Sequence, residues 1–96
     1  MARTASVIFS DMEQCIVCGS PYVEVHHIFM GTANRKISDR YGYVAPLCQY
    51  HHTGTAEGVH HNKDFRNRLK QEAQKHYEAN HGTRQDFIKT FGKSYL

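Results

Sequence analysis

The chain has 96 residues, a formal net charge of +3 and a hydrophobic fraction of 40%, and it contains no tryptophan. This length suffices for one compact domain and is too short for two domains with separate cores. A core of this size leaves a fold marginally stable, so an additional stabilising element such as a bound metal ion is expected. The sequence therefore predicts a single domain over residues 1–96.

Cysteine count and hydropathy indicate the compartment. Cys15, Cys18 and Cys48 are an odd number of thiols, which a secreted disulfide framework would not leave. No stretch approaches the roughly 18 apolar residues of a membrane span, and the first residues lack the long apolar run of a signal peptide. We therefore expect a soluble, cytoplasmic protein with no membrane partner.

The positive charge is concentrated towards the C-terminus. Residues 62–96 carry eight Lys and Arg against four Asp and Glu, whereas residues 1–61 carry four against five. A basic surface suits a polyanionic partner such as nucleic acid, although the solvated helices of many other proteins are equally basic.

The first half of the chain alternates turns with strand-like segments. Cys-x-x-Cys-Gly at residues 15–19 has the form of a metal knuckle, in which Gly19 makes the tight turn. Residues 22–29 are rich in β-branched and aromatic side chains, which predicts a strand ending near His26 and His27, with adjacent side chains on opposite faces. Residues 30–42 are predicted to form an exposed basic loop, in which Ser38 could start one helical turn. Residues 43–47 predict a second strand, in which Pro46 requires an edge or the final position.

The second half is predicted to be helical. A short helix is expected to begin within residues 48–52, followed by a glycine-bearing loop to residue 58. Apolar residues then recur every three or four positions, which predicts a helix from the N-cap Asn62 to about Asn80. Thr83 to Asp86 has the form of a capping sequence for a last helix that ends at Gly92. Residues 63–96 are therefore a helical C-terminal extension of an α+β fold.

Two short motifs supply four metal-binding side chains. Cys15-x-x-Cys18 and Cys48-x-x-His51 each have the local spacing of half a structural zinc site, and the predicted strands lie between them. The alternatives are a redox-active Cys pair or unrelated buried thiols, but a thioredoxin-like site needs a βαβ context that this chain does not provide. We expect one zinc ion that contributes folding energy.

Histidine is the most over-represented residue type, with eight in the chain. Beyond His51, five more fall in the same region, which is more than a folding site needs and predicts a second, open metal site: His26, His27, His52, His60 and His61. Hydrolysis of a phosphodiester needs a base for the water and a cation for the developing charge, and imidazole can serve both needs near neutral pH. His76 and His81 stand apart and are expected to be ordinary surface or hydrogen-bonded residues.

These motifs together resemble those of a known family. Cys15-x-x-Cys18, then Val25-His26-His27-Ile28, then Pro46-Leu47-Cys48-x-x-His51-His52 resembles the HNH endonucleases, and the likeness covers residues 15–62. Through His26 to Phe29, Arg35-Lys36 and Val59-His60, the chain is most similar to small HNH proteins encoded by phages and prophages. The resemblance implies a ββα-metal fold and metal-dependent cleavage of DNA in a bacterial host.

The resemblance also implies a role for each histidine. It makes His27 the general base, and His26 and His52 the first and second ligands of a catalytic divalent ion, which would be Mg²⁺, Mn²⁺ or Zn²⁺. His60 is our expectation for the third ligand, with His61 as the alternative. Arg35, Lys36 and Arg40 are expected either to hold phosphates beside this metal or simply to be solvated.

The chain departs from the family pattern at one position. The middle Asn of the family, which braces the segment between the strands, corresponds to Tyr43 here. Asn34 or Asn62 would then have to brace the site from elsewhere. The departure supports one alternative to an endonuclease, a catalytically inactive, zinc-stabilised nucleic-acid-binding module. A separate alternative is a zinc-ribbon module in which the additional histidines are incidental and the helical tail binds a partner protein.

Overall fold

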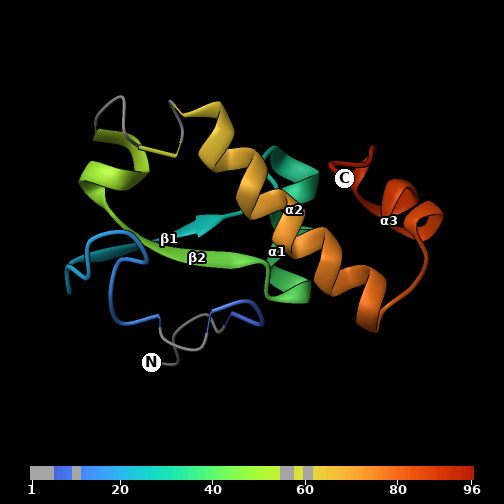
Figure 1. The fold of residues 1–96 in the computed structure, drawn as a ribbon, viewed down its shortest axis with the longest axis horizontal. Coiled ribbons are helices and arrows are strands. Elements are labelled where there is room, and N and C mark those ends of the chain that lie inside the picture. Colours follow the sequence, from blue (N-terminus) through green and yellow to red (C-terminus); the bar gives the residue numbers. More distant parts are fainter. Residues whose placement is uncertain (1–5, 10–11, 55–57, 60–61) are drawn as a thin grey trace.

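A computed structural model of the chain describes residues 6–9, 12–54, 58–59 and 62–96. The elements follow the order β1 (Val23–His27), α1 (Thr32–Tyr41), β2 (Val44–Cys48), a short π-helix η1 (Tyr50–Gly54), α2 (Lys63–Asn80) and α3 (Arg84–Phe91). The two strands form an antiparallel sheet, and α3 packs against both α1 and α2 (Figure 1). The predicted α+β class is therefore confirmed. Within the described residues, no helix is both long and apolar enough to cross a bilayer.

The register of the sheet determines which residues of β1 and β2 lie opposite one another. Val23 pairs with Cys48 at one end, and His27 pairs with Val44 at the other. Every residue of β2 is buried, including Pro46, which pairs with Val25. Pro46 is tolerated because both strands of a two-stranded sheet are edge strands.

The prediction of a loop at residues 30–42 is wrong, because α1 occupies ten of these residues. Ile37 and Tyr41, four residues apart, pack against the core, so tertiary burial outweighs the weak helix propensity of the neighbouring Asn, Ser and Asp residues. Gly42 ends the helix in the left-handed conformation, with φ of +76°, which a residue with a side chain rarely adopts.

The two C-terminal helices agree with the sequence prediction. The side chain of Asn62 accepts a hydrogen bond from the backbone amide of Phe65 and so caps α2. Thr83 and Asp86 form a reciprocal capping box at the start of α3. The expected short helix after the second strand is present as η1, which starts two residues beyond Cys48.

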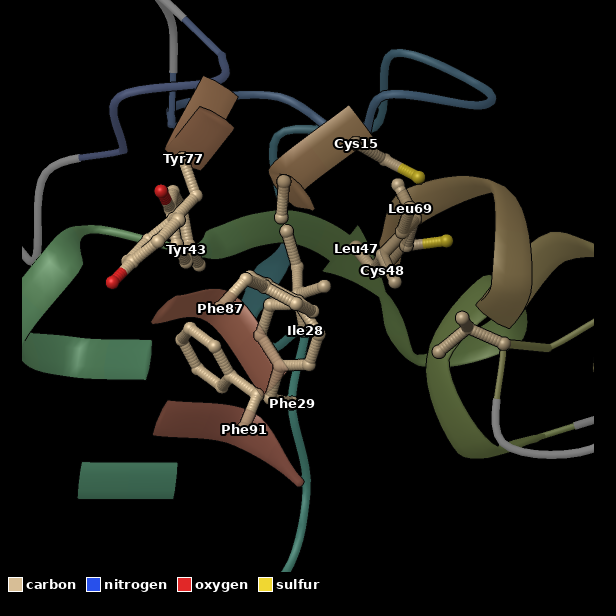
Figure 2. Close-up of a cluster of buried hydrophobic side chains, with 12 residues drawn as sticks. Cys15, Ile28, Phe29, Tyr43, Leu47, Cys48, Leu69, Tyr77, Phe87 and Phe91 are labelled. Atoms are coloured by element: carbon tan, nitrogen blue, oxygen red, sulfur yellow. The ribbon is translucent and has the colours of Figure 1, made fainter. Parts of the chain in front are cut away.

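The core is an aromatic cluster that extends to the cysteines. Phe29 lies at its centre, with its ring 4.2 Å from that of Phe91 and 5.6 Å from that of Phe87. Figure 2 shows the sulfurs of Cys15 and Cys48 at the other end of this cluster, beside Leu69. One continuous core thus connects the C-terminal helices to the cysteine motifs.

Candidate functional site

The four residues of the two Cys/His motifs come together at one point. The ligand atoms of Cys15, Cys18, Cys48 and His51 all lie within 4.8 Å of one another. Cys18 Sγ is 3.6 Å from Cys48 Sγ, and His51 Nδ1 is 3.3 Å from Cys48 Sγ and 3.7 Å from Cys15 Sγ. In a tetrahedral zinc site, neighbouring sulfur and nitrogen ligands lie roughly 3.5 to 3.8 Å apart. The four side chains could therefore hold a metal ion.

Backbone hydrogen bonds fix the knuckle that carries Cys15 and Cys18. The amide of Gly19 donates to the carbonyl of Cys15, and Gly19 has a φ of +77° as the predicted tight turn requires. The amide of Ile16 donates to the carbonyl of Pro46 and so ties the knuckle to β2. Burial raises the pKa of the Cys15 thiol, but backbone hydrogen bonds, foremost from Cys48, outweigh this effect and lower the pKa to about 6. The three cysteines, all within the described residues, form no disulfide.

A second, separate feature is a cavity lined by histidines. It has a volume of about 240 Å³ and lies beside the end of β1 and η1. His26, His27 and His52, the three residues predicted to be catalytic, all line it. The remaining lining residues are Val25, Met30, Gly31 and Arg35.

The rings of His26 and His52 lie edge to face beside this cavity. Their ring centres are 5.2 Å apart at an interplanar angle of 70°. Two imidazoles bound to one ion at tetrahedral angles have ring centres roughly 5 Å apart, so this spacing suits two ligands of a shared metal. His60 and His61, the expected third ligand and its alternative, lie outside the described residues.

Two of the cavity histidines contact a carboxylate. His27 Nε2 is 2.8 Å from Asp39 Oδ1, and His52 Nδ1 is 2.8 Å from Glu24 Oε1. In each pair the histidine side chain is 15% exposed and the carboxylate side chain 52% exposed. A carboxylate on one ring nitrogen orients the imidazole and determines which nitrogen is left for a proton or a metal.

The end of β1 is anchored by the two core residues that come directly after it. Ile28 and Phe29 are each 1% exposed and belong to the buried cluster. His26 is also 1% exposed, whereas His27, the last residue of the strand, is partly exposed. The sequence predicted the side chains of His26 and His27 on opposite faces of the strand. Both histidines nevertheless line the same cavity.

The three predicted phosphate-binding residues all lie on α1, not on a loop. Arg35 lines the histidine cavity, whereas Lys36 and Arg40 are exposed and do not line it. Lys36 and Arg40 are four residues apart and therefore share one side of the helix. The helix thus presents one arginine to the cavity and two further cations to solvent.

Tyr43, at the position where the HNH resemblance leads us to expect an Asn, is wholly buried in the aromatic core. Its hydroxyl lies 3.2 Å from His76 Nδ1, and its backbone carbonyl accepts a hydrogen bond from the amide of Ile28. Asn34 donates to the carbonyl of Phe91, and Asn62 caps α2, so neither braces the histidine cavity as expected from the sequence. Bracing comes instead from the backbone of Tyr43 and from the side chain of Ser38.

A larger open hollow of about 620 Å³ lies between the knuckle and α2. Its lining is mixed, with apolar residues such as Phe9 and Phe65 beside charged ones such as Arg68, and among the four cluster ligands only His51 borders it. Because three histidines and an arginine line the smaller cavity, and two of these histidines each contact a carboxylate, we take that cavity as the candidate functional site.

Asp39 and Glu24 are the functional candidates that the sequence did not reveal. Glu24 precedes His26 by two residues, so strand alternation alone places both on the same side of β1. Asp39 has a comparable signal only once residues 32–41 are known to be helical, since it then shares a face with Arg35. Comparison of the chain with protein-family models, with curated proteins and with solved structures finds no significant match.

Proposed function

We propose that the chain is a metal-dependent endonuclease of the HNH type, with a ββα-metal core over residues 15–62, that hydrolyses DNA phosphodiester bonds. The observation that carries the proposal is the convergence of His26, His27, His52 and Arg35 on one cavity. In addition, His27 and His52 each contact a carboxylate at 2.8 Å, which is the arrangement that orients imidazoles for proton transfer and metal binding.

Each cavity residue has a distinct part in this function. His27 is the general base that takes a proton from the attacking water. His26 and His52 hold the divalent ion, with His60 or His61 as the further ligand. Bound there, Mg²⁺, Mn²⁺ or Zn²⁺ supplies positive charge that offsets the charge developing on the phosphate and the leaving oxygen. Arg35, which also lines the cavity, binds the phosphate.

The Cys15, Cys18, Cys48 and His51 group would hold a structural zinc ion. Three thiolates and one imidazole are a donor set typical of closed zinc sites, and the measured ligand separations suit a tetrahedron. His51 is followed directly by His52, so a metal that holds His51 also holds the start of η1 and with it a catalytic ligand. The zinc acts through folding and not through the reaction.

DNA is the substrate that the charge distribution supports. The chain carries a net charge of +3, and Lys36 and Arg40 are exposed on the same helix as the cavity residue Arg35. Contacts from such residues to phosphates position a nucleic acid without reading its sequence. We therefore expect cleavage of low sequence specificity.

The test is nicking of supercoiled plasmid with and without divalent metal, comparing the wild type with His27→Ala. Removing a general base is expected to lower the rate by about 10²- to 10⁴-fold. His81→Ala, the same substitution at an exposed histidine that does not line the cavity, is the matched control and should cut at the wild-type rate. Absence of cutting by the wild type, or equal cutting by His27→Ala, would reject the proposal; plasmid binding without cutting would instead favour an inactive nucleic-acid-binding module.

A further inference from the structure

We propose that Asp39 is a positioning residue for His27, an inference that rests on the proposed endonuclease function. Asp39 Oδ1 is 2.8 Å from His27 Nε2, so the carboxylate accepts the Nε2–H hydrogen bond and fixes the ring. This interaction links the last residue of β1 to a residue of α1 that lies twelve positions further along the chain.

The place of Asp39 on the helix is a poor one for an acidic residue. Asp39 lies in the last turn of α1, where the carbonyl end of the helix dipole disfavours a negative charge, and Asp has a low helix propensity. An exposed pair of this kind contributes little to stability. Helix stability therefore does not explain an acidic residue at this position, whereas the contact with His27 does.

The neighbouring residue, Ser38, connects α1 to Phe29, which lies two residues after the end of β1. Its Oγ accepts a hydrogen bond from the amide of Phe29 and donates one to the carbonyl of Phe29, both at 3.1 Å, and Ser38 is completely buried. The carbonyl of Ser38 also accepts from the amide of Tyr43 at 2.8 Å. These bonds fix residue 38 to residue 29, and so fix Asp39 relative to His27 two residues earlier.

This geometry determines which nitrogen acts in the reaction. With Nε2–H donating to Asp39, the proton of the attacking water goes to Nδ1 of His27. The water oxygen bonds to phosphorus, the bond from phosphorus to the leaving oxygen breaks with its electron pair, and that oxygen takes a proton from solvent. Asp39 keeps its negative charge throughout and stabilises the imidazolium that forms.

The experiment compares steady-state cleavage by Asp39→Ala with that by the wild type. We expect kcat to fall about 10- to 100-fold, as when carboxylates that orient other functional histidines are removed, with KM for the plasmid changed less than about twofold. Asp64→Ala removes the same group from an exposed position on α2 that does not line the cavity and should leave both constants unchanged. NMR of the imidazole nitrogens should find His27 in the Nε2–H form in the wild type and in a mixture of tautomers in Asp39→Ala.

The outcomes separate this inference from the proposed function. If the wild type cuts and Asp39→Ala cuts with the same kcat, or loses only affinity for the plasmid, Asp39 is not a positioning residue, whereas the endonuclease assignment stands. If the wild type does not cut, the endonuclease assignment falls and the inference falls with it. Asp39→Asn, which keeps the size of the side chain, carries the same test if the alanine variant does not fold.

Discussion

Glu24 lies on β1 and contacts His52, one of the two proposed metal ligands of the cavity. Its carboxylate lies 2.8 Å from Nδ1 of His52, so an ion bound to this imidazole would take Nε2. Carboxylates in this position fix the tautomer of a ligating histidine and raise its basicity. We therefore predict that Glu24 affects metal binding through His52, although Glu24 itself binds no metal.

Glu24→Gln is expected to weaken binding of the catalytic ion by about 10- to 100-fold. The measurement is a titration of Mn²⁺ by calorimetry into protein whose cysteine site is already loaded with zinc. Glu72→Gln, at a surface residue paired with Lys75, is the matched control and should bind Mn²⁺ like the wild type. Equal affinity for Glu24→Gln and the wild type would show that the carboxylate does not support a metal ligand.

At the same scale, the sequence allowed prediction of residues that carry their own chemistry but not of their partners. Cys15, Cys18, Cys48 and His51 are recognisable because two short spacings encode the ligand geometry locally, and the structure brings these four together. Asp39 and Glu24 act only through where they are placed, which depends on the packing of α1 and on the sheet register. Carboxylates are too common on protein surfaces for their type alone to indicate such a role.

Among the elements, α2 and α3 could be predicted and α1 could not. α2 carries a long apolar period with an Asn cap, and α3 has a capping box, so local signals agree with the fold. α1 has no side-chain cap at Gly31 and only one face with apolar contact, made by Ile37 and Tyr41. The missed signal was the four-residue spacing of these two residues with Gly42 directly after them.

Ser38 connects α1 to Phe29, two residues after β1, and removing its hydroxyl should weaken the attachment of the helix. Ser38→Ala leaves the buried amide and carbonyl of Phe29 without these hydrogen bonds, at a cost of about 1–3 kcal/mol in the free energy of unfolding. Denaturant unfolding measures the change. Ser20→Ala, which removes a hydrogen bond to an exposed amide, is the control and should cost less than about 0.5 kcal/mol. A Ser38→Ala variant as stable as the control would mean that the two side-chain hydrogen bonds of Ser38 do not hold α1 in place.

For the whole molecule, the cysteine cluster and the aromatic core form one structure. Cys15 and Cys48 belong to the same buried cluster as Phe29 and Phe87, so the metal ligands are also core residues. The general α+β arrangement was predictable because strands and helices have distinct periods. The route of the chain between the strands was not, because α1 depends on contacts with α3 that lie far along the sequence.

This continuity predicts that removing the metal from the cysteine cluster destabilises the entire fold. Without an ion, three thiol groups and an imidazole are left close together at one end of the core, and the knuckle loses the ion that would join Cys15 and Cys18 to Cys48 and His51. Chelation is expected to lower the midpoint of thermal unfolding by on the order of 10 °C or more, because metal binding and folding are coupled.

Native mass spectrometry should find the cysteine-bound zinc in the His52→Ala variant and not in Cys48→Ser. Cys48→Ser should also unfold near the midpoint of the chelated wild type, whereas His52→Ala should unfold near that of the metal-loaded protein. A midpoint that chelation leaves unchanged would show that the four side chains hold no structural metal and that the hydrophobic core alone sustains the fold.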